Sequence, residues 1–349
     1  MPDVRNAAIL GTGLIGTSIA LGLSDAGWDV VGWDPDPAHA AEGRARGAFS
    51  STAGTMAEAV GDAKLIVLAA PGSVIPTLLG ALHQEELAPD AVVTDVASVK
   101  ASVMDAASHL KSFIGGHPMA GREMSGPEPA TGALFKGAAW VLVASDESTT
   151  PAREMVESMV EDLGAFPVYV SADEHDAAVA MISHLPHALA AALIASASET
   201  PSAIHLAAGS FRDLTRVALS EPDAWTDILR TNRTAVAHSI DDLVERLASF
   251  KELLLHDDPD VLVERLSLAR ETRQRLSPPV ALVRVALSDR PGELGKVGSA
   301  LQASQVDIRD LQLRHQEHGG GGILSLSVRI GETDVLTDAL VDAGLEVLI

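Results

Sequence analysis

Short apolar runs alternate with longer segments of helical periodicity along the first third of the chain. Residues 6–10 form an apolar run that ends in the sequence GTGLIG, and helical spacing follows over residues 17–27. A second apolar run, residues 28–33, ends at Asp34. This order of strand, glycine turn, helix and strand predicts a βαβ unit.

The same alternation continues to about residue 170. Further strands are predicted at residues 64–71, 91–96, 138–145 and 165–171, with helices over residues 76–87 and 151–164. Strands that are apolar throughout and separated by helices are typical of a parallel sheet covered on both faces. Residues 1–170 are therefore predicted to form a doubly wound α/β sheet of the Rossmann type, a dinucleotide-binding domain.

Residues 171–276 have a helical pattern without strands. Ser171 and Glu174 have the spacing of a capping box, which predicts the start of a long Ala-rich helix, and Pro186 predicts a kink within it. Amphipathic helices are predicted over residues 227–258 and 260–276. Wide apolar stripes on helices without a sheet of their own are often buried in a dimer, so we expect a homodimer through this all-helical domain.

The last seventy residues are predicted to form a separate small domain. A charged and then Pro-rich segment, residues 273–280, is a credible linker. Residues 280–349 then follow the order βαββαβ, with a Gly-rich hairpin at residues 317–322. No catalytic constellation is visible in this two-layer module.

Composition narrows the class of protein. A chain of 349 residues with 47% hydrophobic and 21% charged residues is a globular protein of two or three domains. A formal net charge of −23 argues against nucleic acid or an anionic membrane as a partner. The absence of cysteine excludes disulfides and thiolate chemistry. We see neither a secretion signal nor an apolar segment long enough to span a bilayer, so we expect a cytoplasmic enzyme or sensor.

The glycine turn has the chemistry of a dinucleotide site. Gly11 permits the tight turn, Gly13 lets the backbone approach a pyrophosphate, and Gly16 lets the helix pack close to the strand. Asp34, 18 residues after Gly16, is placed to accept from a ribose 2′-OH and would repel a 2′-phosphate, which favours NAD over NADP. Glycine turns join many strands to helices, but here the flanking strands and the acidic residue agree. The predicted cofactor-binding residues are Gly11, Gly13, Leu14, Ile15, Gly16, Asp34 and Pro71.

Two further positions carry candidate chemistry in this domain. His117 lies in the sequence FIGGHPMAGREMSG, residues 113–126, where glycines and proline predict a stiff, tightly turned loop that holds a titratable imidazole. Ser98 follows a predicted strand, where it is either the N-cap of the next helix or a ligand contact.

The helical domain carries two histidines on one face. His184 and His187 are three residues apart, beside Ser183 and Pro186. Either histidine alone is typical of a solvated or core imidazole, but a polar cluster at a kink in an apolar helix favours a ligand site. Without thiolates or an H-E-x-x-H arrangement, no metal site is predicted.

Arg212 and Arg216 form a basic pair four residues apart, on one face if the segment is helical. In a chain this acidic they are either partners of surface carboxylates or a guanidinium fork for a substrate carboxylate.

Five motifs, in this order, resemble those of the prephenate dehydrogenase family, and the resemblance runs from about residue 5 to the C-terminus. They are GTGLIGTSIA, VTDVASVK, GGHPMAGREMSG, SHLPHALA and GSFRDLTRVA. The C-terminal segment, with DRPGEL after its first strand, resembles an ACT domain. That resemblance implies an amino-acid effector, tyrosine or phenylalanine, bound near Asp289, Pro291 and Gly292.

The family resemblance also implies a mechanism. Hydride leaves C4 of prephenate for NAD+, the C4 hydroxyl loses its proton, and CO2 departs as the ring becomes aromatic. By analogy, His117 accepts from that hydroxyl and Ser98 orients His117. The implied substrate-binding residues are His187, Ser183, Arg216, Glu123, Arg212 and Trp225. Arg122 departs from the family pattern, which often has a small hydroxyl residue there.

Three alternatives remain beside prephenate oxidation. The substrate could be arogenate, which has an amino acid side chain in place of the pyruvyl group. The chain could be a β-hydroxyacid dehydrogenase, although that group relies on a lysine where this helix has His184 and His187. A non-catalytic sensor of NAD and an amino acid could keep the same fold, but it would have no need of His117, Ser98 and Arg216 together.

Overall fold

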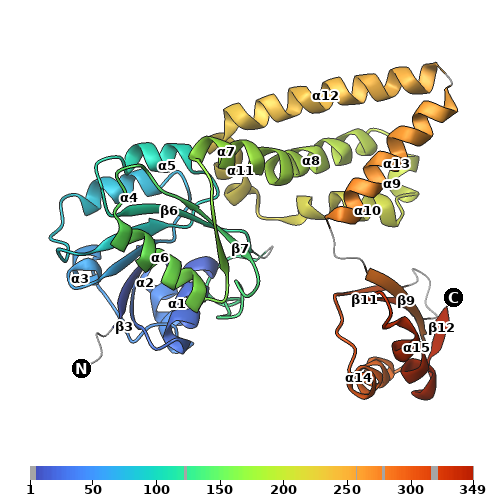
Figure 1. Ribbon diagram of the computed structural model, residues 1–349, viewed down its shortest axis with the longest axis horizontal. Helices are drawn as coiled ribbons and strands as arrows, with labels where there is room; N and C mark the ends of the chain where they lie inside the picture. The colour runs from blue at the N-terminus through green and yellow to red at the C-terminus, as the bar shows by residue number, and fades with distance from the viewer. Residues whose placement is uncertain (1–4, 122–123, 257, 277–279, 316–320, 349) are drawn as a thin grey trace. The chain divides into compact units, whose positions relative to one another are not determined.

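The computed structural model describes residues 5–121, 124–256, 258–276, 280–315 and 321–348. The chain divides into two compact units, Met1–Arg246 and Leu247–Ile349. Figure 1 shows the elements of both, and each unit is described by itself.

The first unit is built on an eight-stranded sheet with the order β3-β2-β1-β4-β5-β6-β7-β8. Its strands are β1 (Asn6–Leu10), β2 (Asp29–Trp33), β3 (Ser51–Thr52), β4 (Leu65–Leu68), β5 (Val92–Asp95), β6 (Phe113–Pro118), β7 (Ala139–Val143) and β8 (Phe166–Tyr169). Neighbouring strands are parallel except β6 and β7, which are antiparallel. The prediction of a Rossmann-type sheet is confirmed, but β6 and β7 are not joined by a crossover helix among the described residues, which permits the antiparallel pairing.

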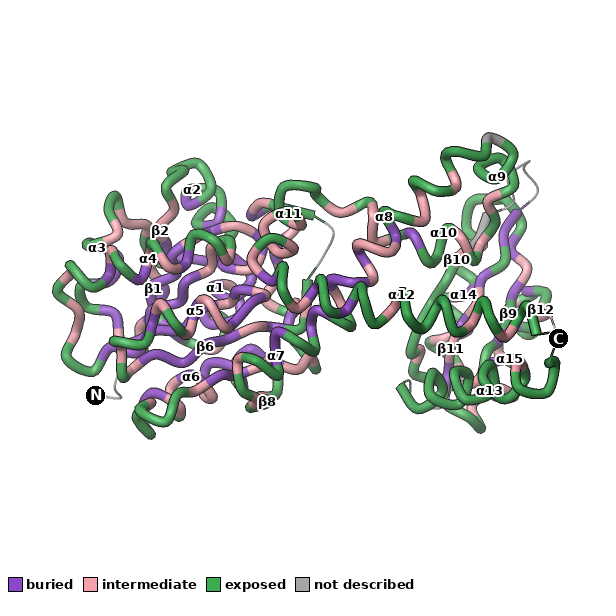
Figure 2. The backbone as a smooth tube through the Cα atoms, turned by 90° about the horizontal axis from the view of Figure 1, so that it is seen from above, coloured by how far each residue is buried: buried purple, intermediate pink, exposed green. Residues whose placement is uncertain are grey.

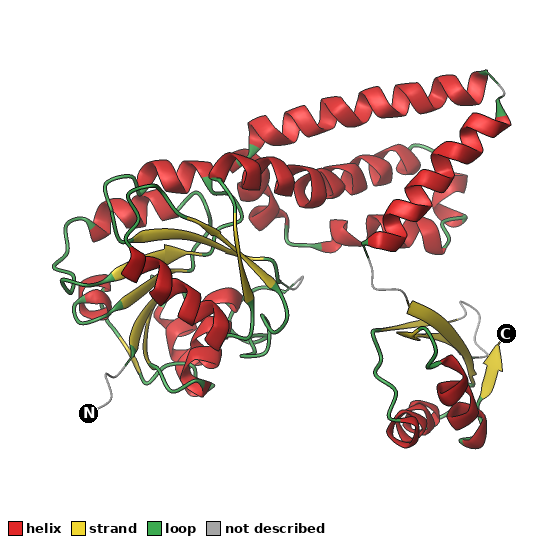
Figure 3. Ribbon diagram, in the orientation of Figure 1, coloured by secondary structure: helices red, strands yellow, loops and turns green. Residues whose placement is uncertain are grey.

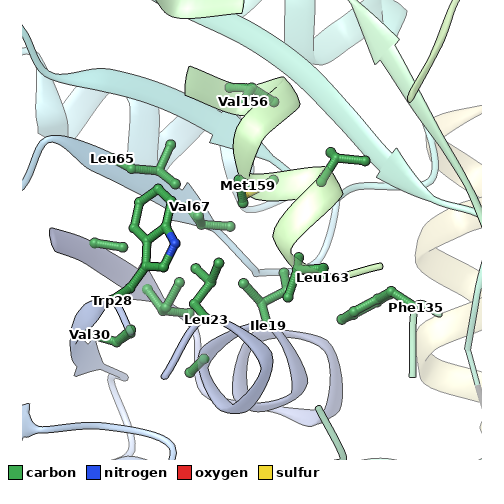
Figure 4. Close-up of a cluster of buried hydrophobic side chains, with 14 of the residues drawn as sticks. Ile19, Leu23, Trp28, Val30, Leu65, Val67, Phe135, Val156, Met159 and Leu163 are labelled. Carbon is green, nitrogen blue, oxygen red and sulfur yellow. The ribbon is translucent and has the colours of Figure 1, made fainter. Parts of the chain in front are cut away.

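Helices cover both faces of this sheet (Figure 3). They are α1 (Leu14–Asp25), α2 (Pro37–Ala45), α3 (Met56–Val60), α4 (Ile75–Leu82), α5 (Ala101–Ala106) and α6 (Thr150–Asp162). Alternate residues of β4 enter different cores: Leu65 and Val67 pack with α1 and α6, whereas Ile66 and Leu68 pack with α3 and α4. Figure 4 shows the first of these cores, around Trp28. Burial on both faces is the reason that the strands read as unbroken apolar runs.

His117 lies in strand β6, so the expectation of a turned loop is wrong for residues 113–118, whereas residues 119–121 and 124–126 lie outside any helix or strand. Two of the glycines that suggested a loop, Gly115 and Gly116, are close to neighbouring atoms within the sheet. A Cβ on Gly116 would lie 2.5 Å from the carbonyl oxygen of Asp95, and one on Gly115 would lie 2.9 Å from the sulfur of Met104. Gly116 is therefore required for close packing against the backbone, whereas the atom nearest Gly115 belongs to the flexible side chain of Met104, and neither glycine has a positive φ.

The helical segment of the first unit begins as predicted. The capping box of Ser171 and Glu174 is present at the start of α7 (Ala172–Val179). A π-helical turn, Ala180–His184, then leads into α8 (Leu185–Ser198), which places Pro186 in the first turn of α8. Because proline has no N–H to donate, it interrupts the backbone hydrogen bonds of this continuous helical stretch, and the π-helical turn lies directly before it. The segment continues with α9 (Pro201–His205), α10 (Gly209–Thr215), a 3₁₀ helix (Arg216–Leu219) and α11 (Pro222–Thr231). Helix α12 (Arg233–Leu255) begins in this unit and ends in the second, because the boundary falls after Arg246.

One helical stretch of the described residues, Ala172–Ser198, is long and apolar enough to cross a bilayer, with 27 residues and a mean hydropathy of 1.7. The expectation that no segment reaches this length is therefore wrong. A core helix of a soluble protein meets the same two criteria. Of the apolar window in this stretch 33% is buried, and the stretch also carries the buried polar side chains of His175, Asp176, His184 and His187.

The second unit contains α13 (Pro259–Arg275) and a four-stranded antiparallel sheet with the order β10-β11-β9-β12. The elements after α13 are β9 (Val280–Leu287), α14 (Glu293–Ser304), β10 (Asp310–His315), β11 (Gly322–Arg329), α15 (Thr333–Asp342) and β12 (Glu346–Leu348). The predicted βαββαβ order is confirmed, with Val285, Leu326 and Leu340 in its core. Most of the predicted hairpin connection and residues 277–279 of the predicted linker lie outside the described residues.

Candidate active site

Four predicted site segments meet at one edge of the large sheet. Strands β1, β4, β5 and β6 are mutually parallel, so their carboxyl ends lie at the same edge. The glycine turn follows β1, Pro71 follows β4, Ser98 follows β5, and His117 is the penultimate residue of β6. Ligands of open α/β sheets bind at this edge, where the strand order reverses between β1 and β4.

The geometry of the glycine turn suits a dinucleotide pyrophosphate. Gly11 has φ +102°, and a Cβ there would lie 2.3 Å from the carbonyl oxygen of Ala69. A Cβ on Gly16 would lie 1.9 Å from the carbonyl oxygen of Gly11, so α1 packs directly against the turn. A Cβ on Gly13 would meet nothing within 4 Å, and no side chain caps α1 at this residue. The N-terminus of α1, with Leu14 and Ile15, is thus open to an anion.

Asp34 is bonded to the glycine turn. Its Oδ2 accepts from the backbone N–H of Thr12 at 2.7 Å and from the Thr12 hydroxyl at 3.1 Å. Its Oδ1 accepts from the N–H of Asp36 at 2.9 Å. Asp34 therefore shapes the turn, in addition to the ribose contact that the sequence predicts for it.

Ser98 is not the N-cap of the following helix. Helix α5 begins at Ala101, and its first N–H groups are capped by a distant carboxylate: Asp176 of α7 accepts from the N–H of Lys100 at 2.7 Å and from that of Ala101 at 2.9 Å. Ser98 lies half-buried in the segment between β5 and α5. Of the two interpretations of Ser98, only the ligand contact remains as a prediction.

A buried ion pair fixes the segment around Ser98 to the strand of His117. The side chains of Lys100 and Asp95 are both fully buried and bonded to each other, and Lys100 Nζ also donates to the carbonyl oxygen of Gly116 at 2.7 Å. Asp95 accepts from the N–H groups of Ala97 at 2.8 Å and Gly116 at 3.0 Å. Burial lowers the pKa of Lys100, although the Asp95 carboxylate opposes that shift.

His117 is half-buried and hydrogen-bonded to a second histidine. Its Nδ1 lies 2.8 Å from Nε2 of His175, and Nδ1 of His175 lies 2.7 Å from Oδ1 of Asp176. Burial holds the pKa of His117 well below its ordinary value of 6.5, and positive charge on His175 and Lys100 would lower it further. The imidazole of His117 is therefore neutral at pH 7 and able to accept a proton.

The predicted His184 and His187 gather around Trp225. The rings of His187 and Trp225 are stacked with centroids 3.6 Å apart, and His184 meets Trp225 edge-on at 6.2 Å. Burial lowers the pKa of His184 to about 4 and lowers that of His187. Asn232 contacts Nδ1 of His184 at 3.2 Å and donates to the carbonyl oxygen of Asp176 at 2.9 Å. Nδ1 of His187 is buried without a hydrogen-bond partner among the described residues, as a ligand-binding group would be.

The predicted arginines do not share one α-helix. Arg212 is in α10, which ends at Thr215, and Arg216 begins the 3₁₀ helix that follows. Both are exposed, and both have interactions within the chain. Ser183 is half-buried in the π-helical turn. Glu123 and Arg122 lie outside the described residues.

The sequence did not reveal five residues of this network: Asp95, Lys100, His175, Asp176 and Asn232. His175 and Asp176 follow the capping box directly, where a charged pair reads as a solvated helix face. Asp95 and Lys100 belong to the motif VTDVASVK, but nothing in their spacing shows that they pair in the interior. Their burial could be known only from the folded chain.

Known proteins resemble both the sheet domain and the helical segment of this chain. Residues 19–169 match the nucleotide-binding domain of prephenate dehydrogenase, and residues 171–268 match its dimerization domain. A prephenate dehydrogenase of Lactococcus lactis is 35% identical over 262 residues, which cover 72% of this chain and 70% of the relative. The chain belongs to the prephenate dehydrogenase family.

Other members of the prephenate dehydrogenase family extend the similarity. The prephenate dehydrogenase of Bacillus subtilis is 27% identical over 364 residues, which cover 99% of this chain and 98% of that protein. The A. aeolicus enzyme, solved with hydroxyphenyl propionate and NAD+, is 29% identical with a TM-score of 0.74, over 79% of this chain and 99% of that one. Synechocystis arogenate dehydrogenase is 30% identical with a TM-score of 0.71, over 78% of this chain and 100% of that one. The predicted family, fold class and assignment as an oxidoreductase are confirmed.

Proposed function

We propose that this chain catalyses the NAD-dependent oxidative decarboxylation of prephenate to 4-hydroxyphenylpyruvate, a step of tyrosine biosynthesis. The observation that carries the proposal is His117, a neutral, half-buried imidazole at the ligand-binding edge of a nucleotide-binding sheet. Membership of the prephenate dehydrogenase family supports it.

The residues at the glycine turn fit NAD. The N–H groups at the start of α1 would hold the pyrophosphate, and the N-cap residue Gly13 has no side chain to obstruct it. Asp34 would accept from the ribose while it braces the turn through Thr12. Pro71 would line the same site; it lies two residues after Ala69, whose N–H donates to the carbonyl oxygen of Leu10. NAD supplies the hydride acceptor; the A. aeolicus relative was solved with NAD+.

His117 removes the proton of the C4 hydroxyl as the C4–H bond breaks and its hydride leaves. The electrons of the carboxylate C–C bond complete the aromatic ring as CO2 departs. His117 then returns the proton to the phenolate oxygen, so the reaction consumes no net proton. Ser98, after the neighbouring strand β5, would donate to the same oxygen and orient His117.

The substrate carboxylates call for cationic and polar partners. Arg216 is proposed to bind one of them, with Arg212 as a second basic group and Glu123 adjusting the charge of the pocket. The stacked pair of His187 and Trp225 offers an aromatic wall with an unpaired ring nitrogen, near Ser183. These roles come from the family resemblance, and the positions of His187 and Trp225 support them.

Arogenate is the second candidate substrate, because a solved arogenate dehydrogenase resembles this chain as closely as the A. aeolicus prephenate dehydrogenase does. The test is NADH formation by the purified protein with prephenate and arogenate offered separately. We expect turnover of prephenate. Turnover of arogenate alone would make arogenate the substrate. Turnover of neither would favour the non-catalytic sensor of NAD and an amino acid.

Replacement of His117 by Asn tests the base. His117→Asn should lower kcat by about 10²- to 10⁴-fold, the usual contribution of a general base, while NAD+ binding persists. His109→Asn is the matched control, since this histidine lies after α5, away from the site edge, and should leave kcat unchanged. Near-normal turnover in His117→Asn would refute the assignment.

A homodimer is proposed through the helical segment. Residues 171–268 match the family's dimerization domain, and most residues of helices α12 and α13 are exposed (Figure 2). The large apolar side chains exposed on these two helices are Ile240, Val244, Leu247, Leu254, Leu255, Val261, Val263, Leu266 and Leu268. Analytical ultracentrifugation should report a dimer, which a charged substitution at Leu266 should weaken. A cytoplasmic location fits this acidic, cysteine-free biosynthetic enzyme.

The C-terminal domain is proposed to bind tyrosine or phenylalanine. A cavity of about 260 Å³ is lined by the predicted effector residues Asp289, Pro291 and Gly292 at the start of α14. We expect one of these amino acids to change the activity or oligomeric state of the full chain, and Asp289→Ala to weaken that response. If a chain truncated after Leu276 responded as the full chain does, the effector site would lie elsewhere.

A further inference from the structure

Three side chains form a continuous hydrogen-bonded row that ends at His117. Asp176 contacts Nδ1 of His175, and Nε2 of His175 contacts Nδ1 of His117, at 2.7 and 2.8 Å. His175 and Asp176 are almost completely buried. Each of the two bonds holds one proton, so with a neutral His175 the protonation of one end decides the protonation of the other.

Asp176 is the fixed end of the row. Burial opposes its ionisation, but hydrogen bonds from His175 and from the N–H groups of Ala101 and Lys100 together hold the pKa of Asp176 below its ordinary value. An ionised carboxylate only accepts hydrogen bonds, so the proton between it and His175 resides on Nδ1 of His175.

That placement propagates to His117. A neutral His175 protonated at Nδ1 presents a lone pair at Nε2, which accepts from Nδ1–H of His117. His117 then carries its only proton at Nδ1, and Nε2 is left as the basic nitrogen. A second proton on His175 would turn its Nε2 into a donor and reverse the arrangement.

We propose that His175 and Asp176 are positioning residues that hold His117 as the Nδ1–H tautomer and so make its Nε2 the base. When Nε2 takes the substrate proton, the bond from Nδ1–H to His175 stabilises the imidazolium. The same carboxylate caps α5, which follows Ser98, so Asp176 links the base to the segment that orients it. The role in turnover rests on the proposed function, whereas the tautomer itself does not.

Two replacements of His175 separate positioning from mere packing. In His175→Gln the amide N–H₂ can donate to Asp176 and the amide oxygen can accept from His117, so the direction of the row survives. His175→Leu removes both groups at similar size. We expect kcat to stay within about 3-fold in His175→Gln and to fall about 10- to 100-fold in His175→Leu, the worth of one hydrogen bond to a charged group, with KM little changed.

The tautomer is measured directly by ¹⁵N NMR of the full chain labelled at histidine. His117→Asn identifies the signals of this ring among the 12 histidines. We expect a protonated Nδ1 and a bare Nε2 on His117 in the wild type and in His175→Gln, and a mixture of tautomers in His175→Leu.

The proposal is overturned if wild-type His117 is protonated at Nε2, or if the Gln and Leu variants lose kcat equally. Should His175→Leu not fold, the wild-type and His175→Gln spectra still decide. If the wild type oxidises neither prephenate nor arogenate, the proposed function fails, while the spectra continue to test the tautomer.

Discussion

The buried pair of Lys100 and Asp95 allows a quantitative prediction. Lys100→Met keeps most of the side-chain volume and removes the charge, which leaves the Asp95 carboxylate with no solvent exposure and no cation. Breaking a buried pair from one side typically costs about 3–5 kcal/mol. Asp95 keeps hydrogen bonds from the N–H groups of Ala97 and Gly116, so we expect the lower end, about 3 kcal/mol.

This loss should be visible as a lower melting temperature of the first unit. For a unit the size of Met1–Arg246, each kcal/mol lowers Tm by about 2–4 °C, so about 3 kcal/mol predicts a shift of about 6–12 °C. Tryptophan fluorescence is the appropriate probe, because all four tryptophans of the chain lie in this unit.

Two further variants make the measurement specific. Lys111→Met removes an exposed lysine of the same unit and should shift Tm by no more than about 1–2 °C, in line with the small effects of surface substitutions. Asp95→Asn added to Lys100→Met removes the stranded charge and should recover part of the loss. If the Lys100→Met protein had the same Tm as the wild type, the view that this pair supports the site would be refuted.

Three more predictions follow from the site. The pKa of His117 lies below 6.5, so kcat/KM should stay level as pH falls to 6.5 and decline only below it; a decline centred above pH 7 would contradict the assignment. The pKa of His184 falls from 6.5 to about 4 on folding, so the unfolded state binds more protons than the folded state between these pH values. The free energy of unfolding should therefore drop by up to about 3 kcal/mol from pH 6.5 to pH 4. In urea unfolding, His184→Gln should show a weaker dependence of this free energy on pH. Asp34→Ala should weaken NAD+ binding and reduce the ratio of the affinities for NAD+ and NADP+. Asp36→Ala, which removes the cap of α2, is the matched control. If calorimetric titration gave an unchanged affinity ratio for Asp34→Ala, the ribose contact assigned to Asp34 would be refuted.

Local pattern alone determined much of this protein. The glycine turn, the strands before and after it, the capping box of Ser171 and the βαββαβ order of the last domain were all readable. Each depends on residues within one or two turns or strands of one another, where periodicity and turn chemistry act directly. His117 could be singled out because a histidine among glycines has no packing explanation along the chain.

Tertiary structure decided how these residues work. The glycines beside His117 resemble a loop in sequence, and only the folded chain shows that they are strand positions, with the carbonyl oxygen of Asp95 too close to Gly116 to leave room for a Cβ. His175 lies 58 residues from His117, and Asp176 caps a helix 75 residues before it. Whether a polar side chain is a solvated surface group or a buried proton acceptor depends on which distant segment covers it. That choice is made when the chain packs, and it leaves no periodic signal in the sequence.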